Sequence, residues 1–130
     1  MIGYVIVGTN DLSRAAPFYD ALLAGKGAKR LIETPGMIAW GDNWDKPMVA
    51  VAVPEDGAPA SPGHGHLVAL VQTSRARVDK LYAKAIALGA VDDGAPAMRG
   101  AEKEQGFYAG YVRDLDGNRL CLFFLGPQTG

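Results

Sequence analysis

Apolar residues recur with two different periods along this chain, and each period predicts one type of element. Residues 2–7 are mostly β-branched and apolar, which predicts a buried strand that ends at Gly8. Short apolar runs at about 29–33, 37–41 and 48–53 are separated by turn-forming segments, and they predict three further strands.

A helix is predicted between the first two of these strands. Its apolar stripe consists of Leu12, Ala15, Tyr19, Leu22 and Leu23. Asn10 is placed to cap this helix, and the segment Gly25-Lys26-Gly27 is placed to end it. Because Pro17 lacks the backbone donor that a helix interior needs, we expect the helix to start near Ser13 or to bend at the proline.

The second half of the chain repeats this order of elements. Residues 54–65 are rich in Pro, Gly and Ala and predict a linker. A strand at 67–71, a helix from a cap at Thr73-Ser74 to Gly89 and a short strand near 90–92 follow. A shift of 63 residues superposes Val5 on Val68, Val7 on Leu70, Asp11 on Ser74, Arg14 on Arg77, Phe18 on Leu81 and Tyr19 on Tyr82.

The last elements form a predicted hairpin. Two strands, 107–113 and 119–125, flank the turn Asp114-Leu115-Asp116-Gly117-Asn118. The Asp-Gly and Gly-Asn pairs favour such a turn, because these residues tolerate a positive φ.

Composition narrows the classes of protein to which the chain can belong. A length of 130 residues favours one domain. Thirteen basic and 14 acidic residues give a net charge of −1, which argues against a nucleic-acid partner. A single cysteine, Cys121, excludes an internal disulfide framework. The N-terminal residues have no leader pattern and no apolar run is long enough to cross a membrane, so we expect a cytoplasmic protein without a membrane partner.

Two segments carry a resemblance to a known family. The opening residues 2–19 and the closing residues 107–120, with Arg-Asp-x-Asp-Gly-Asn at 113–118, resemble the vicinal oxygen chelate superfamily of glyoxalases, bleomycin-resistance proteins and extradiol dioxygenases. The resemblance implies an α+β fold in which two βαβββ modules form a curved mixed sheet around a cleft, commonly in a homodimer. Within this single domain, module 1 spans about 1–53 and module 2 about 66–126, with the linker at about 54–65.

The superfamily usually holds a divalent metal with a His or Glu from each of four strands, and such a metal stabilises an oxyanion as it forms. The matching positions here carry Tyr4, no acid within 48–53, Leu67 and Cys121, so we expect no metal cofactor. His66 is the remaining candidate ligand, since a shift of one residue would exchange it with Leu67. The repeat offset favours Leu67 at that position.

Five residues are candidates for lining a ligand pocket: Tyr4, Leu67, Cys121, Trp40 and Tyr108. Cys121 is either a small apolar filler or a ligand-contacting thiol. Trp40 either covers the pocket or packs in the core, and Tyr4 either donates to a ligand or bonds to backbone. Tyr108 and Tyr111 lie on opposite faces of one strand, so at most one of them lines the pocket.

The resemblance, together with the missing metal ligands, implies the binding of a small organic molecule in the cleft, without a metal. The first alternative is a metal-dependent, glyoxalase-like lyase or isomerase, or a dioxygenase, that uses His66. The second is a drug-sequestering resistance protein. That function would require an acidic cleft for a cationic drug, which a net charge of −1 does not favour.

Overall fold

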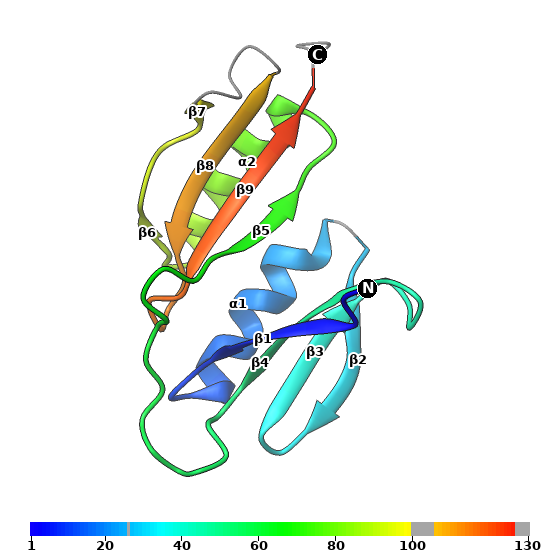
Figure 1. The fold of residues 1–130 in the computed structure, drawn as a ribbon, viewed down its shortest axis with the longest axis vertical. Helices are drawn as coiled ribbons and strands as arrows, with labels where there is room; N and C mark the ends of the chain where they lie inside the picture. The colour runs from blue at the N-terminus through cyan, green and yellow to red at the C-terminus, as the bar shows by residue number, and fades with distance from the viewer. Residues whose placement is uncertain (26, 100–105, 127–130) are drawn as a thin grey trace. The chain divides into compact units, whose positions relative to one another are not determined.

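The computed structural model describes residues 1–25, 27–99 and 106–126. The chain divides into two compact units, Met1–Pro62 and a second unit that begins at Gly63. Each unit is a mixed β-sheet with one helix against one face, as Figure 1 shows. The predicted α+β fold, with two similar modules, is therefore confirmed.

The first unit has a four-stranded sheet in the order β1-β4-β3-β2. Its elements are β1 (Tyr4–Gly8), α1 (Leu12–Ala24), β2 (Lys29–Thr34), β3 (Met37–Gly41) and β4 (Met48–Ala52). β1 runs parallel to β4, and the other neighbouring strands are antiparallel. These elements match the β-α-β-β-β order that the hydrophobic pattern predicts.

The prediction that the first strand is buried was wrong. Tyr4 and Ile6 are 49% and 50% exposed. The reason is the place of β1 in the sheet: it pairs only with β4 and forms an edge, so nothing in its own sheet covers it on the other side.

The start of α1 also differs from the prediction. Asp11, and not Asn10, is the N-cap, since its side chain accepts from the backbone N–H of Arg14. Asn10 instead forms two hydrogen bonds with the backbone of Ala60, at 3.1 and 2.6 Å. Residues 54–62 of the predicted linker therefore belong to the first unit. The helix begins at Leu12 and continues through Pro17.

The second unit has a larger sheet in the order β5-β9-β8-β6, and a further strand, β7, also pairs with β8. Its elements are β5 (Val68–Val71), α2 (Arg75–Ala87), β6 (Val91–Asp92), β7 (Ala97–Met98), β8 (Phe107–Arg113) and β9 (Arg119–Leu125). β7 lies between the predicted strand near 90–92 and the predicted hairpin, where the sequence pattern predicts no element, because two residues are too few to show a period.

The internal repeat extends to the helix caps. α1 and α2 span Leu12–Ala24 and Arg75–Ala87, which are 63 residues apart in sequence. Ser74 caps α2 by accepting from the backbone N–H of Arg77 at 3.1 Å, as Asp11 does for α1. The same local chemistry therefore starts the helix in both units.

Each sheet has a helix-covered face and a distal face, which is the side away from its helix. In the first sheet, Trp40 lies on the helix-covered face, where its indole donates to Asp20 of α1. In the second, Tyr108 does so, because its hydroxyl donates to Asp79 of α2. Side chains alternate along a strand, so these two residues fix the direction of their neighbours.

The β8–β9 turn is held by one buried carboxylate. Asp114 accepts from the backbone N–H groups of Asp116 and Asn118 and from the Asn118 side chain, at 2.9, 2.8 and 3.0 Å. Gly117 has a φ of 86°, the conformation predicted for this turn.

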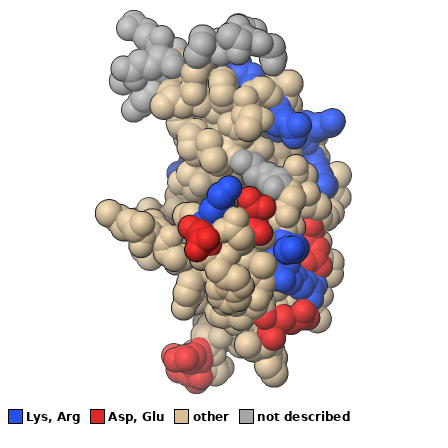
Figure 2. All heavy atoms as spheres, turned by 90° about the vertical axis from the view of Figure 1, so that its right-hand side faces the viewer, with Lys and Arg blue, Asp and Glu red and all other residues tan. Residues whose placement is uncertain are grey.

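Basic and acidic side chains are both present on the face drawn in Figure 2. That face therefore carries no uniform field of one sign, in line with a net charge of −1. Among the described residues, no helix has the length and apolar character needed to cross a membrane.

Candidate functional site

The distal face of the second sheet brings together side chains from three strands. Tyr111 of β8 lies directly opposite Cys121 of β9, and Ala69 of β5 lies beside Cys121. Two residues further along β9, Phe123 lies between Ala109 of β8 and Val71 of β5. All of these residues lie on the same face of the sheet as Tyr111. Side chains alternate along a strand, so this face is the one opposite Tyr108 and points away from α2.

Cys121 and Tyr111 form a cross-strand pair on this face. Cys121 is 3% exposed, and burial raises the pKa of its thiol, while the Tyr111 hydrogen bond and the charges of Arg119 and Arg99 act to lower it. Burial and the neighbouring Cys121 also raise the pKa of the Tyr111 phenol. At neutral pH both groups are therefore protonated, and the pair can offer a hydrogen bond but no negative charge.

Two guanidinium groups flank the Tyr111 ring. The guanidinium carbon of Arg119 lies 4.6 Å from the ring centroid, and that of Arg99 lies 5.3 Å from it. These distances are in the range of a cation–π contact. Arg119 also donates to Asp93 at 2.7 Å, which fixes its position. The site therefore combines a phenol, a thiol and two permanent positive charges.

The first sheet has an apolar distal face. Ala39, Met48 and Ala50 form a buried cluster there, and Leu31 and Ile32 pack against it. Leu31 and Ile32 are adjacent in sequence, and a register shift in β2 between Arg30 and Ile32 brings both to the cluster. Tyr4 lies at the edge of the same face, beside Met48 in the β1–β4 register.

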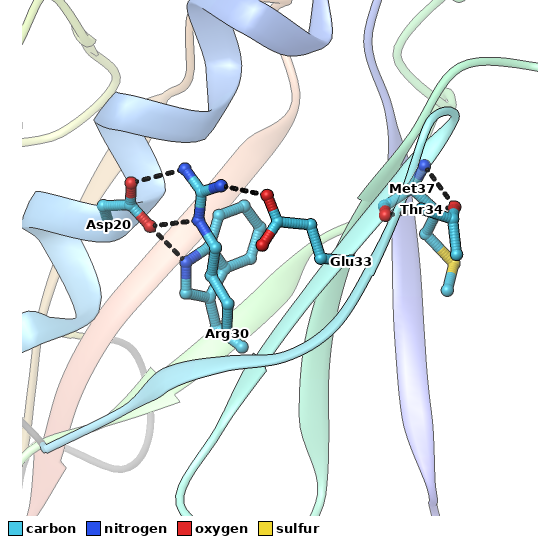
Figure 3. Close-up of polar contacts among 6 residues, drawn as sticks. Asp20, Arg30, Glu33, Thr34 and Met37 are labelled. Carbon is cyan, nitrogen blue, oxygen red and sulfur yellow. Dashed lines mark hydrogen bonds and ion pairs between the residues drawn. The ribbon is translucent and has the colours of Figure 1, made fainter.

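Trp40 lies on the other side of that sheet, under α1. It is 2% exposed, packs 5.6 Å from the Tyr19 ring and donates to Asp20 at 2.7 Å. Figure 3 shows that Asp20 also binds Arg30, which in turn binds Glu33. Of the two roles open to Trp40 in the sequence, packing accounts for these contacts.

Tyr108 lies on the α2 side of the second sheet. Its hydroxyl donates to Asp79 at 2.6 Å, and this bond, with burial, raises the pKa of the phenol. Arg75 of α2 lies 5.5 Å from the ring centroid. The pocket candidate Tyr108 therefore does not share a face with Cys121; Tyr111, which was not among the five candidates, does.

Leu67 and His66 lie just before β5, outside the strand. Leu67 is 39% exposed. His66 is exposed and is held in a turn, where its backbone N–H donates to the carbonyl of Gly63. Its ring lies against Gly63 and leaves no room for a side chain there.

The residues at the superfamily's metal positions do not fit a metal ion. Tyr4 and Leu67 are not the imidazole or carboxylate ligands that such sites use, and a lone thiol such as Cys121 does not complete a ligand set. Among residues 1–25, 27–99 and 106–126, no three or more His, Cys, Asp or Glu side chains are grouped so that they could hold a metal ion.

Arg99 and Arg119 were not among the residues singled out from the sequence. Arg119 carries a signal that could have found it, since it is two residues from Cys121 in a strand and so shares its face. Arg99 carries none, because it lies outside the predicted strands and reaches Tyr111 only through the fold.

The repeated units, each with a helix against a mixed sheet, define a protein of the glyoxalase and bleomycin-resistance fold. Residues 4–123 match the family model of the Glyoxalase-like domain, so the chain belongs to this family and to the vicinal oxygen chelate superfamily. No curated protein matches the chain.

Solved structures agree with this assignment. A glyoxalase/bleomycin resistance protein from Albidiferax ferrireducens T118 is 28% identical, with a TM-score of 0.82 over 95% of this chain and 98% of its own. A glyoxalase-related enzyme from Fulvimarina pelagi is 23% identical, with a TM-score of 0.74 over 95% of this chain and 87% of its own. The second of these similarities shows the fold alone.

Proposed function

We propose that this protein binds a small organic molecule on the distal face of its second sheet, without a metal ion. The observation that carries the proposal is the composition of that face at Tyr111 and Cys121. A phenol and a buried thiol occupy its centre, and the neighbouring side chains Ala69 and Val71 of β5 and Phe123 of β9 are apolar. Such a surface, apolar with a few polar groups, suits a small organic ligand.

A steric block tests where the ligand binds. Ala69 is exposed on the distal face, and Ala76 is exposed on α2. We expect compounds that raise the Tm of the protein to lose this effect in Ala69→Trp and to keep it in the matched control Ala76→Trp. Equal responses of the two variants would place the binding elsewhere.

A metal titration tests the absence of a metal requirement. A bound ion stabilises the folded protein by about 2.7 kcal/mol at a concentration of 100 Kd. After treatment with a chelator, we expect Ni²⁺, Zn²⁺, Mn²⁺ and Fe²⁺ to shift the Tm of the protein and of its His66→Ala variant equally. A shift that is lost in His66→Ala would favour the metal-dependent enzyme instead.

The homodimer and the cytoplasmic location stay predictions. Sedimentation at micromolar concentration measures the first directly. A monomer would contradict it, and the binding proposal would then have to hold for a single chain.

A further inference from the structure

Three arginines gather at one end of the distal face of the second sheet. Arg113 and Arg119 lie directly opposite each other where β8 and β9 meet the turn, and both face Asp93, at 3.6 and 2.7 Å. Arg99 reaches the same region from the segment after β7, where its Nε donates to the carbonyl of Ala109 at 3.1 Å. Two of the three guanidinium groups, those of Arg99 and Arg119, lie over Tyr111.

The charges of this cluster do not balance within the part of the chain that the structure describes. Three arginines are accompanied by Asp93, which two of them share, and by Asp92, whose charge interacts with Arg99. These five side chains together carry a net charge of +1. The hydrogen bonds of Arg99 go to the backbone carbonyls of Ala109 and Ala95, which carry no charge.

Donor capacity is also left over. Arg119 donates to Asp93 through Nε, and its two Nη groups have no hydrogen-bond partner among the described residues. The Arg119 side chain is 38% exposed, so these donors are accessible from solvent. Guanidinium N–H groups in this fork arrangement match the two oxygens of a carboxylate.

An apolar surface adjoins the arginines along the same strand. Phe123 packs 5.6 Å from Phe107, and Val71 beside it is 56% exposed. Arg119 and Phe123 are four residues apart in β9, which corresponds to about 13 Å along an extended strand. The face is therefore charged at one end and apolar at the other.

We propose that the distal face binds an amphipathic organic monocarboxylic acid, with its carboxylate on Arg99 and Arg119 and its apolar part on Phe123 and Val71. The proposal rests on the binding function above and names the class of ligand. One excess positive charge is neutralised by a monoanion, whereas a dianion such as a phosphate monoester would leave a negative charge in excess.

Phenylbutyrate and its neutral amide, phenylbutyramide, test the proposal because they differ in charge and hardly in shape. We expect the acid to bind at least about tenfold more tightly in an NMR titration. The shifted amide signals should come from β8 and β9. Acetate, which lacks the apolar part, should bind more weakly than phenylbutyrate.

Three variants locate the charge that matters. Arg99→Gln and Arg119→Gln should each weaken phenylbutyrate binding several-fold and leave phenylbutyramide unaffected. Arg77→Gln removes an equal charge from the exposed side of α2 and serves as the matched control. Arg99→Lys keeps the charge and loses the fork, so it should recover only part of the affinity.

The outcomes separate this inference from the proposed function. Equal affinity for acid and amide, or equal losses in Arg77→Gln and Arg119→Gln, would overturn the carboxylate assignment and leave small-molecule binding in place. If neither these compounds nor a wider panel of neutral and charged aromatics bound at millimolar concentration, both proposals would fall.

Discussion

Tyr111 and Cys121 lie directly opposite each other in the β8–β9 ladder, and each side chain influences the pKa of the other. Burial raises the pKa of the Cys121 thiol, and the phenol of Tyr111 partly offsets that increase. The reactivity of the thiol should therefore depend on the tyrosine.

Replacing Tyr111 with Phe should raise the pKa of Cys121 further, because the thiolate loses a donor. The rate of alkylation by iodoacetamide, measured against pH, should then rise at a higher pH than in the unmodified protein. Tyr108→Phe is the matched control, since it removes a phenol from the opposite face of the same strand. A similar change in both variants would contradict the pairing.

The Asp20 network predicts a loss of stability in acid. Asp20 accepts from Arg30 at 2.9 and 2.7 Å and from Trp40 at 2.7 Å, and the Arg30 hydrogen bond is the main cause that lowers its pKa (Figure 3). A carboxylate whose pKa is lowered by folding stabilises the protein above its unfolded pKa of 3.8, and that contribution is lost as the pH falls through the folded pKa.

In Asp20→Asn, urea unfolding should therefore show a smaller decrease in the free energy of unfolding between about pH 5 and pH 2. The comparison variant is Asp42→Asn, which removes a carboxylate from the exposed pair with Lys46 in the same unit. The same pH dependence in Asp20→Asn and in the unmodified protein would exclude the network as a source of acid sensitivity.

Asp114→Ala should lower the free energy of unfolding by about 2–3 kcal/mol, because it leaves buried donors at the β8–β9 turn without their acceptor. Asp116→Ala, in the same turn, should cost less, since the Asp116 side chain is not buried. Chemical denaturation measures both. Equal costs would mean that the turn is held by its backbone alone.

Ser74→Ala should cost about 1 kcal/mol, because the first turn of α2 loses its cap. Thr73→Ala is the control, since the neighbouring threonine is exposed and does not cap the helix. The sequence pointed to the pair Thr73-Ser74 without separating its members, and thermal unfolding of the two variants would do so.

The elements of this fold could largely be predicted from the sequence, because each of them has a local pattern of apolar and turn-forming residues. The helices at Leu12–Ala24 and Arg75–Ala87 and the hairpin strands at Phe107–Arg113 and Arg119–Leu125 have clear periods and turn signals. The exposure of β1 could not be predicted, since composition does not show whether a strand lies at the edge of a sheet.

The candidate site was less predictable, because the alternation of side chains within a strand does not show which face of the strand lies against the helix. Alternation shows that Tyr108 and Tyr111 face opposite ways, and only the contact with Asp79 of α2 shows which way Tyr108 points. The place of Arg99 in the site was harder still to predict, since its contact with Tyr111 depends on the course of the chain between β6 and β8.

The turn held by Asp114 decides more than the stability of a hairpin. Because the side chains of a strand alternate, a turn longer by one residue would rotate β9 about its axis, present Leu120 and Leu122 on the distal face and bury Arg119 against α2. The chemical identity of the surface offered to a ligand thus depends on the length of the turn that joins β8 to β9.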